Sequence, residues 1–236
     1  MSGPIRLTSD LPDRRVPPAP PRETIAGRFA RLEPLDPRAH GADLRAHFAK
    51  DDAIWRYMAY GPFPGDDDFR RWLDTRAEPA DPLTFAIVDA ASGRATGLLA
   101  LMAIRPDQGV VEIGNVVLSP ALRRTTAATE AIYLALKRVF ALGYRRVEWK
   151  CDARNVASKN AAKRFGFQFE GLFRQHMIVK GENRDTAWFA MLDCEWPDRE
   201  TAFEGWLAPR NFDSAGRQIR PLVSFEPPEK LGYGLG

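Results

Sequence analysis

The stretch that most constrains the fold is residues 110–143, which reads as a strand, a short basic loop and a helix. The run VVEIGNVVL is rich in β-branched residues and too short for a typical helix, so it predicts a strand. Ser119-Pro120 ends that strand, because proline cannot donate a hydrogen bond to a sheet. Apolar residues at helical spacing over 128–142 predict a helix, and Gly143 stands where glycine commonly ends one.

The start of this helix is a candidate anion-binding site. Helix N-termini expose unpaired backbone N–H groups and the positive end of the helix dipole. Here that end carries Arg123, Arg124 and the hydroxyl groups of Thr125 and Thr126. Such a terminus suits a phosphate or pyrophosphate. The alternative is an ordinary capped helix with two solvated arginines. Glu130 lies one residue too late to form a capping box with Thr126.

The layout resembles the acyl-CoA-binding motif of the GNAT superfamily of N-acyltransferases, in which a strand leads into a loop of pattern Gln/Arg-x-x-Gly-x-Gly/Ala that opens a helix. In this chain the pattern reads Arg123-x-x-Thr126-x-Ala128. AATEA after the loop and EIG at 112–114 resemble the branch that contains the ribosomal-protein N-terminal acetyltransferases. The resemblance resumes in NVAS and RFGFQFEG and spans roughly residues 24–196. Thr126 replaces the family glycine, and a β-branched residue disfavours positive φ and holds the backbone further from a ligand.

The resemblance implies an α/β (α+β) fold with a mixed, mostly antiparallel sheet flanked by helices. It implies acetyl-CoA as co-substrate, no metal, and transfer of an acetyl group to a primary amine on a protein or peptide N-terminus or on a small molecule. It also implies that strand residues 116–118 pair with the pantetheine arm. The cofactor contacts that it implies are Val116, Val117, Leu118, Arg123, Arg124, Thr125, Thr126, Ala127, Ala128, Thr129, Asn155 and Ser158.

Acyl transfer from a thioester to an amine needs a deprotonated amine, whose pKa is about 8 for an α-amino group and about 10.4 for a lysine-like amine. Glu112 is the candidate general base, although a structural salt bridge accounts for a strand carboxylate equally well. A backbone N–H near Asn115 or Val116 is the candidate oxyanion donor. Many relatives carry a tyrosine in the helix after NVAS, where this chain has Ala162. Ser158 is therefore the candidate to contact the thiol.

The most aromatic stretch is 51–77. It predicts two short helices that pack their aromatic side chains inward. The alternative is a wall of the acceptor pocket, with Trp55, Tyr57 and Tyr60 as candidate substrate contacts.

The rest of the chain predicts strands and helices in a simple order. Three consecutive strands with short turns argue for an antiparallel meander. Cys151 is expected to be a buried apolar residue and not a nucleophile. Further strands are expected at 24–35, 83–90, 95–104, 144–153, 167–180 and 183–193, and helices from 36 or 37, over 155–166 and over 197–207.

The 236 residues predict a proline-rich arm (1–22), one acetyltransferase domain (23–197) and a C-terminal helix with a tail (198–236). A net charge of +3 argues against a dedicated nucleic-acid binder. The chain has no apolar run of ~20 residues for a membrane and no secretory signal. We therefore expect a cytoplasmic protein without nucleic-acid or membrane partners.

Two further questions stay open at this point. Edge strands and exposed aromatic residues leave room for a homodimer. Thr126 and Ala162 leave room for a non-catalytic CoA-binding regulatory or interaction protein. The chain has none of the motifs GxxxxGK[ST], GxGxxG, GxSxG or HExxH, which argues against other nucleotide enzymes, serine hydrolases and zinc proteases.

Overall fold

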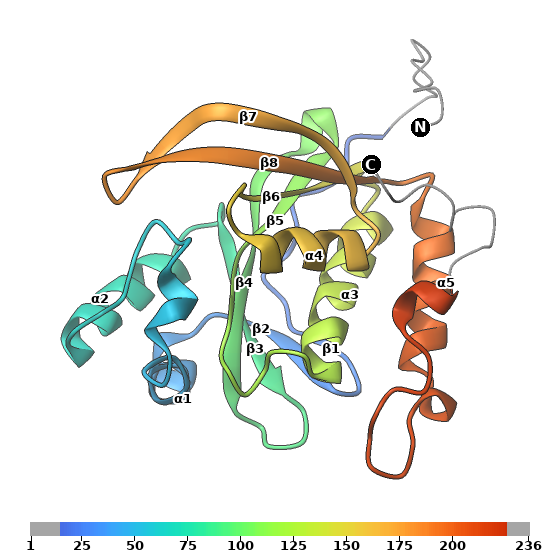
Figure 1. The fold of residues 1–236 in the computed structure, drawn as a ribbon, viewed down its shortest axis with the longest axis horizontal. Coiled ribbons are helices and arrows are strands. Elements are labelled where there is room, and N and C mark those ends of the chain that lie inside the picture. The colour runs from blue at the N-terminus through green and yellow to red at the C-terminus, as the bar shows by residue number, and fades with distance from the viewer. Residues whose placement is uncertain (1–14, 226–236) are drawn as a thin grey trace.

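The computed structural model describes residues 15–225. These residues form an eight-stranded sheet with strand order β1-β2-β3-β4-β5-β6-β8-β7 (Figure 1). The strands are β1 (Ile25–Ala26), β2 (Ala30–Pro34), β3 (Leu83–Asp89), β4 (Ala95–Arg105), β5 (Val110–Leu118), β6 (Arg146–Asp152), β7 (Gln168–Val179) and β8 (Glu182–Leu192). The α-helices are α1 (Pro37–Phe48), α2 (Asp66–Ala77), α3 (Thr126–Ala141), α4 (Val156–Arg164) and α5 (Trp196–Leu207).

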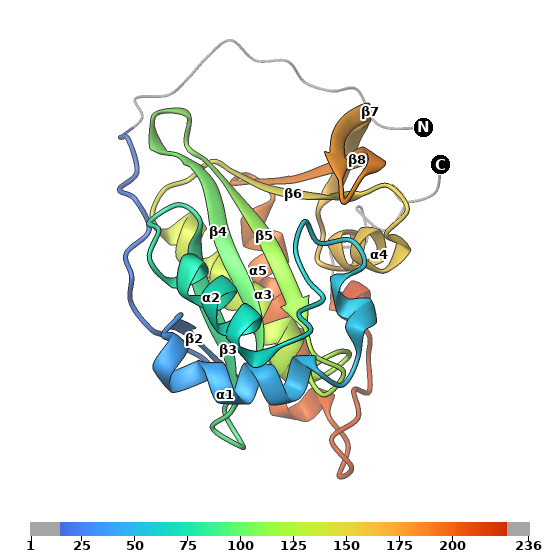
Figure 2. The same cartoon turned by 90° about the vertical axis from the view of Figure 1, so that its left-hand side faces the viewer.

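The sheet is mixed and mostly antiparallel, as predicted. Strands β1 to β5 pair antiparallel in sequence order, and so do β6 with β8 and β8 with β7. The pairing of β5 with β6 is parallel, and α3 provides the long crossover that a parallel pair needs. Helices α1 and α2 cover one face of the sheet, and α3 and α5 cover the other (Figure 2).

The centre of the sheet opens between β5 and β6. The two strands pair over Val110–Glu112 and Arg146–Glu148 and then diverge (Figure 2). Strand β5 also carries a β-bulge, because Leu98 pairs with Val117 while Ala100 pairs with Gly114. The bulge contains Asn115 at a φ of 49°. This irregular half of β5 thus lies where the sheet opens.

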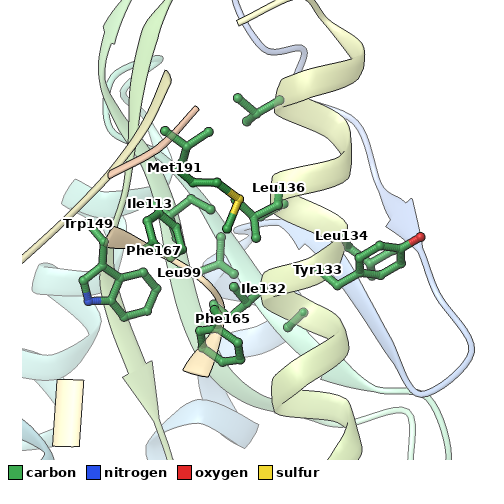
Figure 3. Close-up of a cluster of buried hydrophobic side chains, with 14 of the residues drawn as sticks. Leu99, Ile113, Ile132, Tyr133, Leu134, Leu136, Trp149, Phe165, Phe167 and Met191 are labelled. Atoms are coloured by element: carbon green, nitrogen blue, oxygen red, sulfur yellow. The ribbon is translucent and has the colours of Figure 1, made fainter. Parts of the chain in front are cut away.

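Two hydrophobic clusters hold the helices to the sheet. The cluster under α3 includes Ile113, Ile132, Leu136 and Met191 (Figure 3). The cluster under α1 and α2 is rich in aromatic residues from 48–72, and several of its ring pairs pack edge to face, an arrangement that aromatic rings prefer. The predicted inward packing of this stretch is confirmed, with a 3₁₀-helix (η1, Asp52–Trp55) as the first of its two short helices.

The predicted first strand, 24–35, is wrong in one respect, because the structure divides it into β1 and β2. The turn between them is held by Glu130 of α3, whose carboxylate accepts hydrogen bonds from the backbone N–H groups of Arg28, Phe29 and Ala30. Glu130 is 5% exposed. A side chain at Gly27 would begin 2.6 Å from the Glu130 Oε2 atom. The sequence could not show this break, because the bracing residue is a hundred positions away.

Both ends of the described chain pack on the domain. Pro17 and Pro20 are buried, and the Arg22 Nη1 atom donates to the Ala77 carbonyl oxygen at 2.6 Å. Near the other end, Leu222 is buried. Residues 1–14 of the predicted arm and 226–236 of the predicted tail lie outside the described residues. None of the helices over 15–225 is long and apolar enough to cross a membrane.

Candidate active site

The start of α3 stands directly after β5. Thr125 is the N-cap, and its Oγ1 atom accepts from the Ala128 N–H at 3.1 Å and donates to the Leu122 carbonyl oxygen at 2.7 Å. The N–H groups of Thr126 and Ala127 have no acceptor among the described residues. A helix start with open N–H groups and a fixed cap is suited to an anion.

Thr126 causes no backbone strain at the position of the family glycine. The positive φ in this loop belongs to Arg124, at 63°, whereas Thr126 is the first residue of the helix. The expected conflict between a β-branched side chain and positive φ therefore does not arise.

The two arginines of the loop differ in their partners. The Arg123 Nη1 atom lies 3.0 Å from the Asp51 Oδ2 atom. Arg124 is exposed, and no carboxylate in the described part of the chain lies within ion-pair distance of it. Arg124 is thus the cation available to an anion at this helix start.

The next residues of α3 are buried. Ala127 and Ala128 are 6% and 7% exposed. Thr129 is 4% exposed, and its Oγ1 atom accepts from the Arg164 Nη1 atom at 3.1 Å. Thr129 therefore ties α3 to α4, and the predicted contacts from these three residues can involve little more than backbone groups.

The start of α4 stands after β6, on the other side of the opening. Asn155 is its N-cap and accepts from the Ser158 N–H at 3.0 Å. The Ser158 Oγ atom accepts from the Trp149 Nε1 atom at 2.9 Å, and the Ser158 side chain also hydrogen-bonds the Cys151 thiol. Ala162 is fully buried and offers no group for proton transfer.

Cys151 is not a nucleophile candidate in this structure. It is 6% exposed, as predicted for an apolar residue. Burial raises the pKa of its thiol, so the group stays protonated.

Glu112 forms the salt bridge that was one of its two interpretations from the sequence, and its role as general base stays a prediction. Its Oε2 atom lies 3.0 Å from the Lys150 Nζ atom, so it forms a salt bridge. Burial raises the pKa of Glu112, and the neighbouring Lys150 charge only partly opposes this. Lys150 also lies 2.9 Å from the Glu148 Oε2 atom and packs over the Trp188 ring at 3.9 Å.

Two of the three aromatic candidates for substrate contact are brought together, since the ring centroids of Trp55 and Tyr60 lie 6.0 Å apart. Trp55 is 2% exposed and belongs to the aromatic cluster. Tyr60 packs at 4.9 Å from the Trp72 ring, and burial raises the pKa of its hydroxyl. Tyr57 lies apart, where its hydroxyl donates to the Arg154 carbonyl oxygen at 3.2 Å.

Tyr57 lines a pocket of about 160 Å³ that the sequence did not reveal. The pocket forms where three segments meet, namely the chain after η1, the turn between β6 and α4, and the tip of the β7–β8 hairpin. No sequence pattern joins these three segments, which are separate in the chain. Its lining residues are Arg56, Tyr57, Asp152, Arg154, Val179, Lys180 and Glu182.

The other charged and polar groups do not form a metal site, since no group of three suitable side chains occurs within the described residues. His40 instead accepts from the Asp36 N–H and contacts Glu33, and His176 contacts the Thr186 hydroxyl at 3.0 Å. These histidines have structural partners.

Comparison with known proteins identifies the family of this chain. The family model described as an acetyltransferase (GNAT) domain matches residues 30–168. A GCN5-related N-acetyltransferase from Brucella melitensis is 48% identical, with 89% of this chain and 97% of that chain covered and a TM-score of 0.87. A probable acetyltransferase of the GNAT family from Chromobacterium violaceum is 47% identical, with 83% and 100% covered and a TM-score of 0.77.

More distant structures share the fold alone. An acetyltransferase from Salmonella typhimurium that modifies the N-terminal serine of a ribosomal subunit protein is 19% identical, with 72% of this chain and 99% of that chain covered and a TM-score of 0.61. None of the curated proteins matches the chain. The family model and the two bacterial structures nevertheless agree with each other and with the strand–loop–helix motif, and the chain therefore belongs to the GNAT family of acetyltransferases and is an acyltransferase.

Proposed function

We propose that the protein transfers the acetyl group of acetyl-CoA to a primary amine by direct attack of the amine on the thioester. The observation that carries this proposal is the opening between β5 and β6. The unpaired, basic start of α3 stands at the end of β5, and the start of α4 with Ser158 stands at the end of β6. An extended cofactor with a diphosphate fits between two such strands, with its phosphates at the helix start.

The α3 start fits the diphosphate because two open N–H groups, of Thr126 and Ala127, occur beside the cation of Arg124. The Thr126 hydroxyl is a further donor at this point. Strand residues Val116–Leu118 would bind the pantetheine arm by strand addition, using backbone groups on the side of β5 that has left β6. The cofactor supplies the thioester, and the chain supplies its orientation.

The catalytic roles follow from the same geometry. Glu112 accepts a proton from the amine, directly or through water, because its raised pKa gives the carboxylate a higher proton affinity. A backbone N–H near Asn115 or Val116 stabilises the negative charge on the carbonyl oxygen. The C–N bond forms as the C–S bond breaks, the sulfur leaves as the CoA thiolate stabilised by a hydrogen bond from the Ser158 hydroxyl, and the proton taken up by Glu112 is released to solvent.

The test combines binding with turnover. Acetyl-CoA titrated into the protein in a calorimeter should bind at micromolar concentration, and a panel of amines should cause release of free CoA thiol with an N-acetylated product seen by mass spectrometry. Binding without turnover against every amine would favour a non-catalytic CoA-binding protein. A lack of binding would contradict the proposal.

Three properties of the protein stay predictions. They are the division into an arm, a catalytic domain and a tail, a cytoplasmic location, and a homodimer. Edge strand β7 exposes Phe169, Leu172, Phe173 and Ile178, which is where a second copy would pair. Light scattering on the purified protein tests the dimer.

A further inference from the structure

The pocket beside Tyr57 adjoins the proposed thioester site. Asp152, in its wall, is the last residue of β6, and Arg154 immediately precedes Asn155, the N-cap of α4. Ser158 lies on the first turn of that helix. The other walls come from Arg56 and Tyr57 after η1 and from the hairpin tip. A molecule in this pocket would therefore lie next to the β6–α4 side of the opening.

The two carboxylates of the pocket are already paired. The Arg154 guanidinium lies 2.9 Å and 3.1 Å from the two carboxylate oxygens of Asp152 and 3.0 Å from the Glu182 Oε2 atom. Burial acts to raise the pKa of Asp152, but the Arg154 hydrogen bonds outweigh it and hold that pKa below its usual value. One arginine thus satisfies both negative charges, and neither is free to attract a cationic ligand.

Two further cations in the pocket have no such partner. The Lys180 Nζ atom donates to the Trp55 carbonyl oxygen at 2.9 Å, which leaves its charge uncompensated. The Arg56 guanidinium lies 5.4 Å from the Tyr57 ring centroid. No carboxylate in residues 15–225 lies within ion-pair distance of Arg56 or Lys180. The pocket therefore has an excess of positive charge.

We propose that this pocket binds a carboxylate of the acceptor, so that the enzyme acetylates amines that carry a carboxylate a few bonds from the nitrogen. This inference rests on the proposed function and names its substrate class. Hydrogen bonds from Arg and Lys to a carboxylate are short and charge-assisted. A volume of about 160 Å³ is comparable to a few water molecules at about 30 Å³ each, which suits a group of side-chain size. A polyamine would instead place a cation beside Arg56 and Lys180.

The test uses acceptors matched in length and different in charge. 4-Aminobutyrate carries the carboxylate, butylamine lacks it, and 1,4-diaminobutane replaces it with a cation. With acetyl-CoA in excess, we expect kcat/KM for 4-aminobutyrate to exceed that for butylamine about tenfold and that for the diamine by more. Two short peptide amides, with aspartate or lysine as the second residue, distinguish an acidic peptide acceptor from a free amino acid.

Variants locate the effect in the pocket. Arg56→Gln and Lys180→Gln should each bring the kcat/KM ratio of 4-aminobutyrate to butylamine close to one, whereas Lys180→Arg should retain it. Arg70→Gln, which removes an exposed charge on α2, is the matched control and should keep the wild-type ratio. Unchanged acetyl-CoA affinity in the calorimeter verifies that each variant is folded.

Four results would overturn the inference. A preference for the diamine or the lysine peptide would do so, and so would a charge preference that survives both glutamine variants. Turnover of all acceptors at equal rates would contradict this inference alone, while the proposed function would stand. Acetyl-CoA binding without turnover of any acceptor would contradict both.

Discussion

The two sides of the opening have the same local structure and different chemistry. On each side a strand runs into a helix whose N-cap side chain accepts from the N–H three residues on, Thr125 in α3 and Asn155 in α4. An arginine immediately precedes each cap. Arg124 has no carboxylate partner among the described residues, whereas Arg154 is held by Asp152 and Glu182. The two helix starts thus differ in the carboxylates that surround their arginines, and this difference determines which start can bind an anion.

The carboxylates show the same contrast. Burial raises the pKa of Glu112 on β5, whereas the pKa of Asp152 on β6 is lowered, because the Arg154 hydrogen bonds outweigh burial. The β5–α3 side therefore holds an arginine without a carboxylate partner, Arg124, and a carboxylate with a raised pKa, Glu112. On the β6–α4 side the charges of Arg154 and Asp152 are paired with each other. We expect the first side to bind the cofactor phosphates and supply the base, and the second to contact the leaving sulfur and adjoin the acceptor.

The largest expected effect is on the rate. Glu112→Gln should lower kcat/KM about a hundredfold, which is typical of a lost general base. The wild-type rate should rise with pH through the raised pKa of Glu112, and the variant should lack that rise. Glu148→Gln is the control, because it removes the other carboxylate that contacts Lys150. Equal losses in both variants would make Glu112 a structural ion-pair partner.

The next effect is on cofactor affinity. Arg124→Ala should weaken acetyl-CoA binding about tenfold, or about 1.4 kcal/mol, when measured by calorimetry. Arg123→Ala should have a smaller effect, because Asp51 already pairs with Arg123. Asp51→Asn should strengthen binding slightly, since it releases Arg123 while the amide oxygen can still cap η1. A larger loss for Arg123→Ala would reverse the comparison of the two arginines.

The caps should contribute equally to stability, although their helices differ in function. Thr125→Ala and Asn155→Ala should each lower the free energy of unfolding by about 1 kcal/mol in urea titrations. Added acetyl-CoA should stabilise the Asn155→Ala variant more than the Thr125→Ala variant, because the α3 cap adjoins the proposed diphosphate site. Equal stabilisation of the two would place the diphosphate elsewhere.

The smallest effect concerns stability against pH. The lowered pKa of Asp152 contributes stability that is present above its unfolded value, about 3.9, and is lost as pH falls through the folded value. Asp152→Asn should therefore flatten the decline of Tm between pH 5 and pH 2. The contribution of Glu112 to stability changes with pH in the opposite direction. Because the pKa of Glu112 is raised on folding, its contribution is present below the unfolded pKa and is lost as pH rises. Glu112→Gln should leave the acid decline in place.

The sequence predicted what local signals specify. The strand, loop and helix over 110–143 occur as expected, because β-branched residues, a proline and a glycine cap mark their limits within the segment itself. The antiparallel meander and the buried Cys151 were also confirmed. The predicted site residues on α3 and α4 border the opening, but their roles stay predictions.

The rest depends on contacts between distant segments. The sequence could not show that Lys150 lies opposite Trp188 on β8 and so pairs with Glu112 in a nearly closed environment. Nor could it show that Arg56 and Lys180 line the same pocket. They do so because the tip of the β7–β8 hairpin packs near the chain that connects α1 to α2. Local patterns specify elements, whereas the charges of a pocket are set by their assembly.

The Glu130 contact to the β1–β2 turn has a consequence for the energetics of cofactor binding. Glu130 stands one turn beyond the open N–H groups of α3, and it fastens that turn to three backbone N–H groups at the edge of the sheet. The helix start is thereby fixed before any ligand arrives. The conformational entropy of that region is lost on folding instead of on association, and we expect the affinity for the proposed diphosphate to be correspondingly higher than a free helix end would give.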